Sequence, residues 1–434
     1  MKRIYDFIIV GAGINGLQIG ALLVNEGASV LVLERSGHIG GRAYVWEKDG
    51  FLVDYGIHLI RYGPESAIAK TFRRLGYRIK FKKPGTSYLY EDSKKYIFPT
   101  GVSQFLFTSL ISAGEKIKAA PLLLKVKRMK DQWKELLHVP VNRWMDENGI
   151  KGGLRKYFEL VTGSMLVCPF TDIASSGELL FNMAKVLRTG ISVMYPSGGW
   201  KPLFNFLESK IKENGEIITG TKVTQVVIDG NRVRGVYAGS DFFEGKKVVV
   251  NVPVQEMWSF LDEELFPREY VERTKNLIPT SGVVVDIGLK RKVAEEKGLI
   301  YFYKPMAFGM FTSNIDPSVA PGGKQLLTFF YPTELKDMLD EESRKKREKE
   351  IIDRIFSLWD IEANIEWKRI SHLKMVDGAQ INVNQTRELR PGYKMPGMEN
   401  LYLVGDSLGA PGAGGDVGHE SVHGLYRTLT GKEI

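Results

Sequence analysis

The sequence predicts an α/β fold with a Rossmann-like, mostly parallel sheet, and three observations near its start carry this prediction. Residues 7–10 form a short apolar run that ends at a glycine, as strands buried on both faces of a parallel sheet do. A glycine-rich turn at 11–16 follows, and a helical pattern of apolar residues comes after it. Residues 29–33 form a second apolar run, which ends at Glu34. The order strand, glycine turn, helix, strand is that of a βαβ unit.

The glycine turn has the pattern Gly-x-Gly-x-x-Gly, which suits the binding of a pyrophosphate. Gly11 permits the tight turn, Gly13 lets the backbone approach the phosphates, and Gly16 lets the helix pack close to the strand. Glu34 lies 23 residues after Gly11, where it can accept hydrogen bonds from ribose hydroxyls. A carboxylate there would repel a 2′-phosphate, so NADP is disfavoured. Together these features favour a dinucleotide site over a plain glycine turn.

A second glycine pair follows soon after Glu34-Arg35. It is Gly40-Gly41, and Arg42 comes directly after it. Ordinary nicotinamide dehydrogenases do not need this pair, whereas a guanidinium beside it could neutralise a pyrophosphate through two parallel hydrogen bonds. The simpler interpretation is a glycine turn with a surface arginine.

The far end of the chain repeats the order strand, glycine loop, helix. Residues 400–404 predict a buried strand that ends at Gly405-Asp406, and a glycine-rich stretch at 409–416 leads into a helix from about 417 to 429. Asp406 could bind a ribityl hydroxyl, and the helix N-terminus could stabilise negative charge on a reduced flavin ring. An ordinary strand, loop and helix would give the same pattern.

These motifs resemble the two-domain flavoproteins that include amine oxidases, protoporphyrinogen oxidases and phytoene desaturases. The turn at 11–16, Glu34 and the segment 40–42 resemble the first FAD motif of that family, and 403–406 resembles the second. Residues 195–199 are similar to the segment that leads back into the FAD domain, and 221–226 to the strand whose Val223 backbone would meet the adenine. The resemblance implies a bound FAD.

Nineteen residues are assigned to FAD binding by these motifs and by the resemblance together. They are Gly11, Gly13, Ile14, Asn15, Gly16, Glu34, Arg35, Gly40, Gly41, Arg42, Gly56, Ile57, His58, Val223, Gly405, Asp406, Gly415, Asp416 and Val417. The chain has one cysteine, Cys168, which lies outside the C-terminal motif where amine oxidases attach FAD covalently. The FAD is therefore expected to be noncovalent.

The segment Gly50–His58 resembles the G-F-x-x-D-x-G-x-H pattern of the phytoene desaturase-like branch. This implies an oxidoreductase that takes hydride from a C–H bond of an apolar, isoprenoid- or carotenoid-like substrate. The branch includes desaturases, saturases and isomerases, so the direction stays open. The alternative is an oxidase of amines or porphyrinogens. His58 is the candidate catalytic residue; the simpler interpretation is a hydrogen-bonded core histidine.

Residues 419–423 spell H-E-x-x-H, which on a helix could bind zinc with the glutamate as general base. A zinc peptidase is therefore the remote alternative. It lacks a third ligand, because only 11 residues follow His423 and none of them is a histidine. We expect no metal site.

Two discontinuous domains are expected. Residues 1–62, 196–253 and 391–434 would form the Rossmann-like FAD domain, and 63–195 and 254–390 a mixed α+β substrate domain.

Charge and hydropathy bear on location and partners. Sixty Lys+Arg against 51 Asp+Glu give a net charge of +9, which suits an anionic surface. No uncharged apolar run is long enough to span a bilayer, and no reader motif for nucleic acid accompanies the charge. Segment 104–134 alternates apolar residues with lysines, as helices that rest on anionic lipid do. The alternative is a helix pair packed inward with a solvated basic rim. We expect a cytoplasmic protein, which segment 104–134 could dock on a membrane.

Overall fold

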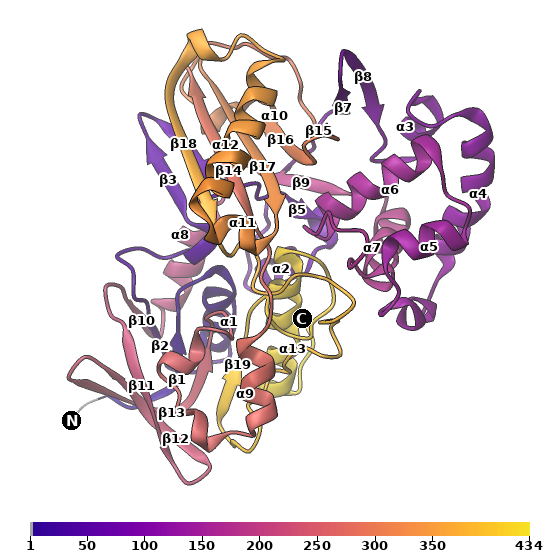
Figure 1. The fold of residues 1–434 in the computed structure, drawn as a ribbon. Helices are drawn as coiled ribbons and strands as arrows, with labels where there is room; N and C mark the ends of the chain where they lie inside the picture. The colour runs from indigo at the N-terminus through magenta and orange to yellow at the C-terminus, as the bar shows by residue number, and fades with distance from the viewer. Residues whose placement is uncertain (1–2) are drawn as a thin grey trace.

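The computed structural model describes residues 3–434 and contains two seven-stranded sheets (Figure 1). In the first sheet, five strands pair in parallel. A two-stranded hairpin pairs antiparallel with one of these five strands. The parallel strands, in spatial order, are β10 (Gly215–Ile218), β2 (Val30–Leu33), β1 (Tyr5–Val10), β13 (Asp241–Val250) and β19 (Leu401–Leu403). The hairpin strands are β12 (Arg232–Ala238) and β11 (Val223–Asp229). The predicted α/β fold class is confirmed.

Helices from distant parts of the sequence cover one face of the first sheet and bury their apolar sides on it. They are α1 (Ile14–Asn25), α2 (Ala67–Arg74), α8 (Lys201–Ile211) and α13 (Gly415–Thr430). The other face packs against residues 254–277, including α9 (Arg268–Lys275). Side chains of α2 and of residues 254–277 thus belong to the core of the first sheet, although both segments were expected in the substrate domain. Their apolar residues gave no sign of which sheet they would meet.

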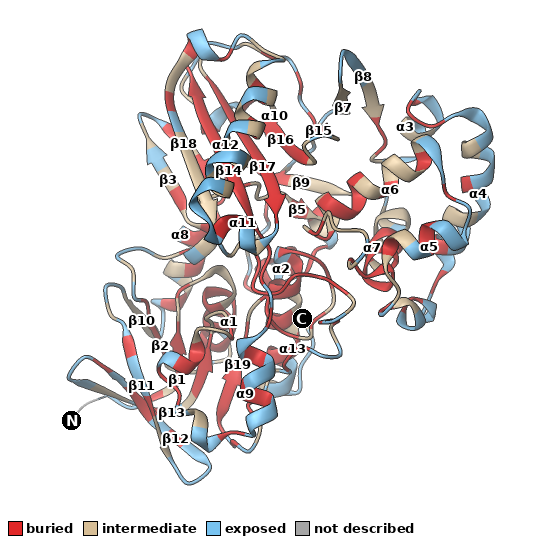
Figure 2. Ribbon diagram, in the orientation of Figure 1, coloured by how far each residue is buried: buried red, intermediate tan, exposed pale blue. Residues whose placement is uncertain are grey.

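The second sheet is mixed and lies beyond the first. Its order is β18 (Ile365–Leu373), β14 (Ser281–Leu289), β17 (Gln325–Thr333), β16 (Ala307–Phe311), β15 (Ile300–Phe302), β7 (Ser87–Glu91) and β8 (Lys94–Phe98). One face packs against the long helix α12 (Glu341–Phe356), and Figure 2 shows β14 and β17 buried along most of their length. Two small sheets are separate from it: β3 (Val45–Lys48) pairs with β4 (Phe51–Asp54), and β9 (Val193–Pro196) pairs with β5 (Ile60–Arg61) and β6 (Phe81–Lys82). The short helices α10 (Thr312–Ile315) and α11 (Leu335–Leu339) contact β17 and β14.

A lobe of helices extends from the second sheet, on the right in Figure 1. It comprises α3 (Val102–Phe107), α4 (Ala113–Arg128), α5 (Val141–Glu147), α6 (Gly152–Met165) and α7 (Ser176–Thr189). The inner helices α6 and α7 carry many buried side chains, whereas α3 has none and α4 has two, Ala119 and Val126. Figure 2 shows α3 and α4 mostly exposed. Within residues 3–434, no helix is both long and apolar enough to cross a bilayer.

Candidate functional site: a cavity between the two sheets

A large cavity of about 980 Å³ joins the two halves of the molecule. Its polar end is formed by the loops that follow β1, β2 and β19, where the parallel strands end. Ligands of open α/β sheets bind at this edge. Seventeen of the nineteen predicted FAD residues line the cavity, and the two exceptions are Gly16 and Val417.

Gly16 and Val417 pack inside the protein and do not line the cavity. A Cβ on Gly16 would lie 2.4 Å from the carbonyl oxygen of Gly11, so only glycine lets α1 approach the turn. Val417 is 1% exposed and belongs to the apolar core beside the helical lobe. Gly16 thus has the packing role that its motif position implies. The Val417 side chain lies in the core and does not line the cavity, and its assignment to cofactor binding stays a prediction.

The N-terminus of α1 faces the cavity through Gly13, Ile14 and Asn15. Its first turn holds no acidic side chain, and its N-cap Gly13 makes no side-chain capping bond. Free N–H groups and the positive end of the helix dipole are therefore presented to the cavity, which suits a phosphate. Asn251, which the sequence analysis missed, donates to the carbonyl oxygens of Gly11 and Gly13 at 3.1 and 3.4 Å and fixes this turn.

Glu34 supports the same turn from the end of β2. One carboxylate oxygen accepts a hydrogen bond from the Ala12 N–H at 2.8 Å, and the other accepts from the N–H and hydroxyl of Ser36. The side chain is buried and also lines the cavity. Its carboxylate therefore shapes the glycine turn, and its proposed bonds to ribose would be additional.

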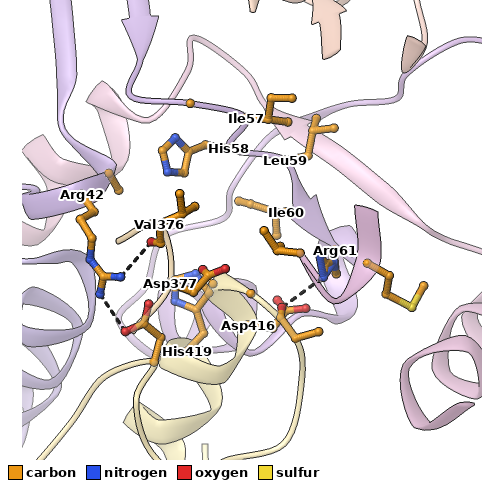
Figure 3. Close-up of a pocket in the computed structure, with 18 of the residues that line it drawn as sticks. Arg42, Ile57, His58, Leu59, Ile60, Arg61, Val376, Asp377, Asp416 and His419 are labelled. Atoms are coloured by element: carbon orange, nitrogen blue, oxygen red, sulfur yellow. Dashed lines mark hydrogen bonds and ion pairs between the residues drawn. The ribbon is translucent and has the colours of Figure 1, made fainter. Parts of the chain in front are cut away.

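Arg42 and Asp406 bond to each other, which the sequence analysis did not foresee. The Arg42 guanidinium donates to Asp406 Oδ1 at 2.7 Å and to the Val376 carbonyl oxygen at 2.8 Å (Figure 3). This ion pair ties the early glycine pair to the last strand, 364 residues later. The pair holds the two FAD motifs together, and their separate roles toward pyrophosphate and ribityl hydroxyl stay predictions.

The N-terminus of α13 also faces the cavity, through Gly415 and Asp416. A Cβ on Gly415 would meet no atom within 4 Å, so the space in front of this helix end is open to a ligand. Two helix N-termini from opposite ends of the chain thus point into one cavity. That arrangement can stabilise negative charge at two places.

Two neutral histidines flank Trp200 in the cavity wall. Burial, with a smaller contribution from Arg42, lowers the pKa of His58 to about 4, and its Nδ1 has no hydrogen-bond partner. Burial likewise lowers the pKa of His419 to about 3, and its Nδ1 lies 2.8 Å from Gln18 Nε2. The Trp200 indole N–H donates to the His58 carbonyl oxygen at 2.8 Å. His58 is therefore available as a neutral hydrogen-bonding group, and its catalytic role stays a prediction.

The H-E-x-x-H residues turn away from one another. His423 Nε2 lies 2.9 Å from the Ala67 carbonyl oxygen on α2, whereas His419 contacts Gln18 on α1, and Glu420 pairs with Lys185 at 3.3 Å. Across residues 3–434, no three His, Cys, Asp or Glu side chains are grouped so that they could hold a metal ion.

Buried polar atoms without partners test whether the cavity fits a polar cofactor. The atoms Asn15 Oδ1, His58 Nδ1 and Asp416 Oδ2 are inaccessible and make no hydrogen bond, and all three residues line the cavity. Such atoms are costly unless a ligand or ordered water satisfies them. Together with the open glycines and the two helix N-termini, they fit a dinucleotide laid along the polar end.

The other end of the cavity is apolar and is built from the helical lobe and the second sheet. Aromatic and aliphatic side chains share it, and Phe98 stacks on Tyr301 with ring centroids 4.0 Å apart. The apolar lining also includes Val102, Phe105, Leu106, Leu123, Leu124, Tyr157, Val161, Met183, Leu187, Phe308 and Phe330. Because α3 and α4 supply part of this wall, the cavity extends to the exposed helices.

Comparison with known proteins identifies the dinucleotide that the cavity binds. A family model for flavin containing amine oxidoreductases matches residues 14–417. The chain belongs to this family. It is an FAD-dependent oxidoreductase, as the sequence motifs predicted. Arg42, Glu34 and the two helix N-termini line the cavity and would hold FAD. When bound, FAD supplies the acceptor for a hydride.

Three similar proteins illustrate the range of the family. A zeta-carotene-forming phytoene desaturase of Myxococcus xanthus is 24% identical over 482 residues, which cover 94% of this chain and 90% of that protein. An oxidoreductase structure from Methanosarcina mazei has a TM-score of 0.81 at 20% identity and covers 98% of this chain and 99% of its own. A putrescine oxidase variant has a TM-score of 0.76 at 16% identity, with 99% of both chains covered. The two structures show the shared fold.

Proposed function

We propose that this oxidoreductase removes a hydride from a C–H bond of a long, apolar, isoprenoid- or carotenoid-like molecule. The apolar end of the cavity carries this proposal, because its aromatic and aliphatic walls would desolvate a hydrocarbon without leaving polar groups unpaired. The similarity to a phytoene desaturase over nearly the whole chain also supports it. An oxidase of amines or porphyrinogens is the alternative. Because a putrescine oxidase has a similar structure, the experiment below includes putrescine.

Anaerobic mixing tests the substrate class. The FAD-loaded protein is mixed with phytoene in phospholipid vesicles, with putrescine, or with coproporphyrinogen, while the loss of flavin absorbance is followed. We expect bleaching with phytoene and none with the other two. Leu123→Arg places a charge in the apolar wall and should prevent bleaching while FAD stays bound. Bleaching by putrescine or coproporphyrinogen alone would contradict the proposed substrate class.

We further propose that α3 and α4 rest on an anionic membrane surface. Five large apolar side chains are exposed within this short segment, and Phe107 and Ile117 are 79% and 74% exposed. The five are Val102, Leu106, Phe107, Ile117 and Leu124. Exposed basic residues lie beside them on α4: Lys118, Lys125, Lys127 and Arg128. An apolar surface rimmed by lysine suits the interface of an anionic bilayer.

The same helices line the cavity, which links docking to substrate entry. Leu106 and Leu124 are both exposed and part of the cavity wall. A hydrocarbon leaving the bilayer at this surface would pass from lipid into the apolar end of the cavity without crossing water. The alternative of an inward-packed pair is disfavoured, because α3 buries no side chain.

Vesicle sedimentation should depend on charge. The protein is expected to co-sediment with vesicles that contain anionic lipid, weakly with neutral vesicles, and less at high salt. Reversing Lys125, Lys127 and Arg128 to Glu should abolish sedimentation and leave FAD bound. The matched control reverses Arg344, Lys345 and Lys346 on α12, which changes the net charge equally at another surface. Sedimentation that is absent with every lipid, or equally lost in the control, would refute the docking surface.

A further inference from the structure

Asp416 is a carboxylate that lines the cavity and has no partner. It is the second residue of α13, is 9% exposed, and makes no hydrogen bond or ion pair in the structure. The other cavity-lining carboxylates are all engaged: Glu34 by Ala12 and Ser36, Glu256 by Arg35, Asp377 by Thr280, and Asp406 by Arg42. Among the cavity-lining acids of residues 3–434, Asp416 alone makes no side-chain hydrogen bond or ion pair.

The proposed reaction needs such a group. Removal of two hydrogens from adjacent carbons breaks two C–H bonds. One hydrogen leaves with its electron pair as a hydride, which passes to the flavin. The other leaves as a proton, and the electron pair of its C–H bond becomes the new C=C π bond. The proton must be received inside a cavity whose apolar walls keep water away, so a base in the lining is required.

We propose that Asp416 is the base that takes this proton, an inference that rests on the proposed function. Its position beside the open Gly415 places the carboxylate at the polar end of the cavity, within the same pocket as His58 and Asp377 (Figure 3). His58 is the other candidate for the base, because it lines the cavity and its Nδ1 has no partner. It is less suited because its pKa is lowered to about 4, so it would bind the proton only weakly.

The surroundings of Asp416 suit proton transfer near neutral pH. Burial raises its pKa to about 6. Arg61 on β5 and Lys185 on α7 lower the pKa, whereas Glu420 on its own helix and Asp377 on the facing loop raise it. The Tyr62 hydroxyl is also close enough for Asp416 to raise the pKa of that phenol. A base with a pKa near the working pH is both ionised enough to accept a proton and basic enough to hold it.

The test uses the FAD-loaded protein and phytoene in vesicles as the probe. In the wild type, the bleaching rate should rise with pH through about 6, because the carboxylate must be ionised to accept the proton. Asp416→Asn should slow bleaching, measured per bound FAD, at least ~100-fold and remove this pH dependence. Asp416→Glu should keep part of the bleaching rate and part of its pH dependence. Asp229→Asn, in the exposed β11–β12 turn, is the matched control and should behave as the wild type.

A second measurement does not require turnover. Infrared difference spectra of the FAD-loaded wild type against Asp416→Asn are recorded from about pH 4 to about pH 8. A protonated carboxyl band that disappears near pH 6 is expected. An Asp416 ionised throughout, or an Asn variant that bleaches as fast as the wild type, overturns the role of Asp416. If phytoene fails to bleach the wild type, the proposed substrate class fails, and the infrared titration still decides whether Asp416 can hold the proton.

Discussion

Gly13→Val should give a folded protein that has lost most of its FAD. The backbone of Gly13 has φ −66° and ψ 166°, which a valine adopts readily, and a Cβ would lie 3.0 Å from the Asn251 amide nitrogen. Asn251 must shift by a few tenths of an ångström to admit the Cβ, so we expect some loss of stability but a folded protein. The valine methyl groups, however, would occupy the space in front of α1 where the phosphates must approach its N–H groups. Loss of those charge-assisted bonds should cost about 2–3 kcal/mol, or roughly 30- to 150-fold in FAD affinity.

The measurement is FAD affinity by fluorescence quenching, together with thermal unfolding of the protein without FAD. Gly322→Val is the matched control, because a Cβ on Gly322 meets no atom within 4 Å and the residue lies far along the chain from the glycine turn. Its FAD affinity should be unchanged. Wild-type affinity in Gly13→Val would show that the phosphates bind elsewhere.

Arg42→Ala should lower both FAD affinity and stability. The change leaves the buried Asp406 carboxylate without its 2.7 Å partner and frees the Val376 carbonyl oxygen. Removal of one partner from a buried pair is costly, but 38% of the Arg42 side chain is exposed, so we expect a loss of about 1–3 kcal/mol in the free energy of unfolding. FAD affinity should fall as well, because a cation beside the pyrophosphate is lost.

The double variant Arg42→Ala with Asp406→Asn separates the two effects. It removes the unpaired charge and should recover much of the stability, measured by denaturant unfolding. If Arg42 also binds the pyrophosphate, FAD affinity should stay below that of the single variant Asp406→Asn, which removes the same carboxylate and keeps Arg42. Recovery of FAD affinity along with stability would mean that Arg42 acts only by holding Asp406 in place.

The polar end of the cavity was largely predictable because its residues belong to local motifs. The glycine turn with Glu34, and the strand and glycine loop at Gly405-Asp406, each specify strand, turn and helix within a few residues. Their partners were not predictable. The Arg42–Asp406 pair and the Asn251 bonds join segments far apart in sequence, and no local pattern records such a contact.

The helical segments were harder to place for a different reason. Apolar spacing predicts that a helix has one buried face, but it does not name the surface that covers this face. Thus α2 and residues 254–277 joined the first sheet rather than the second. On α3 the side chains of Val102, Leu106 and Phe107 remain exposed, although the same pattern allowed an inward-packed helix. Asp416 was assigned to FAD binding from its place in the C-terminal motif. Only the structure shows that its carboxylate has no hydrogen-bond partner.

Acid precipitation of the FAD-loaded protein tests most directly whether the protein binds FAD and holds it without a covalent bond. The only cysteine, Cys168, is buried and does not line the cavity. We therefore expect the yellow colour to pass fully into the supernatant, where it is identified as intact FAD. Colour that stays with the precipitated protein, or a protein that binds no added FAD before precipitation, would contradict this description of the site.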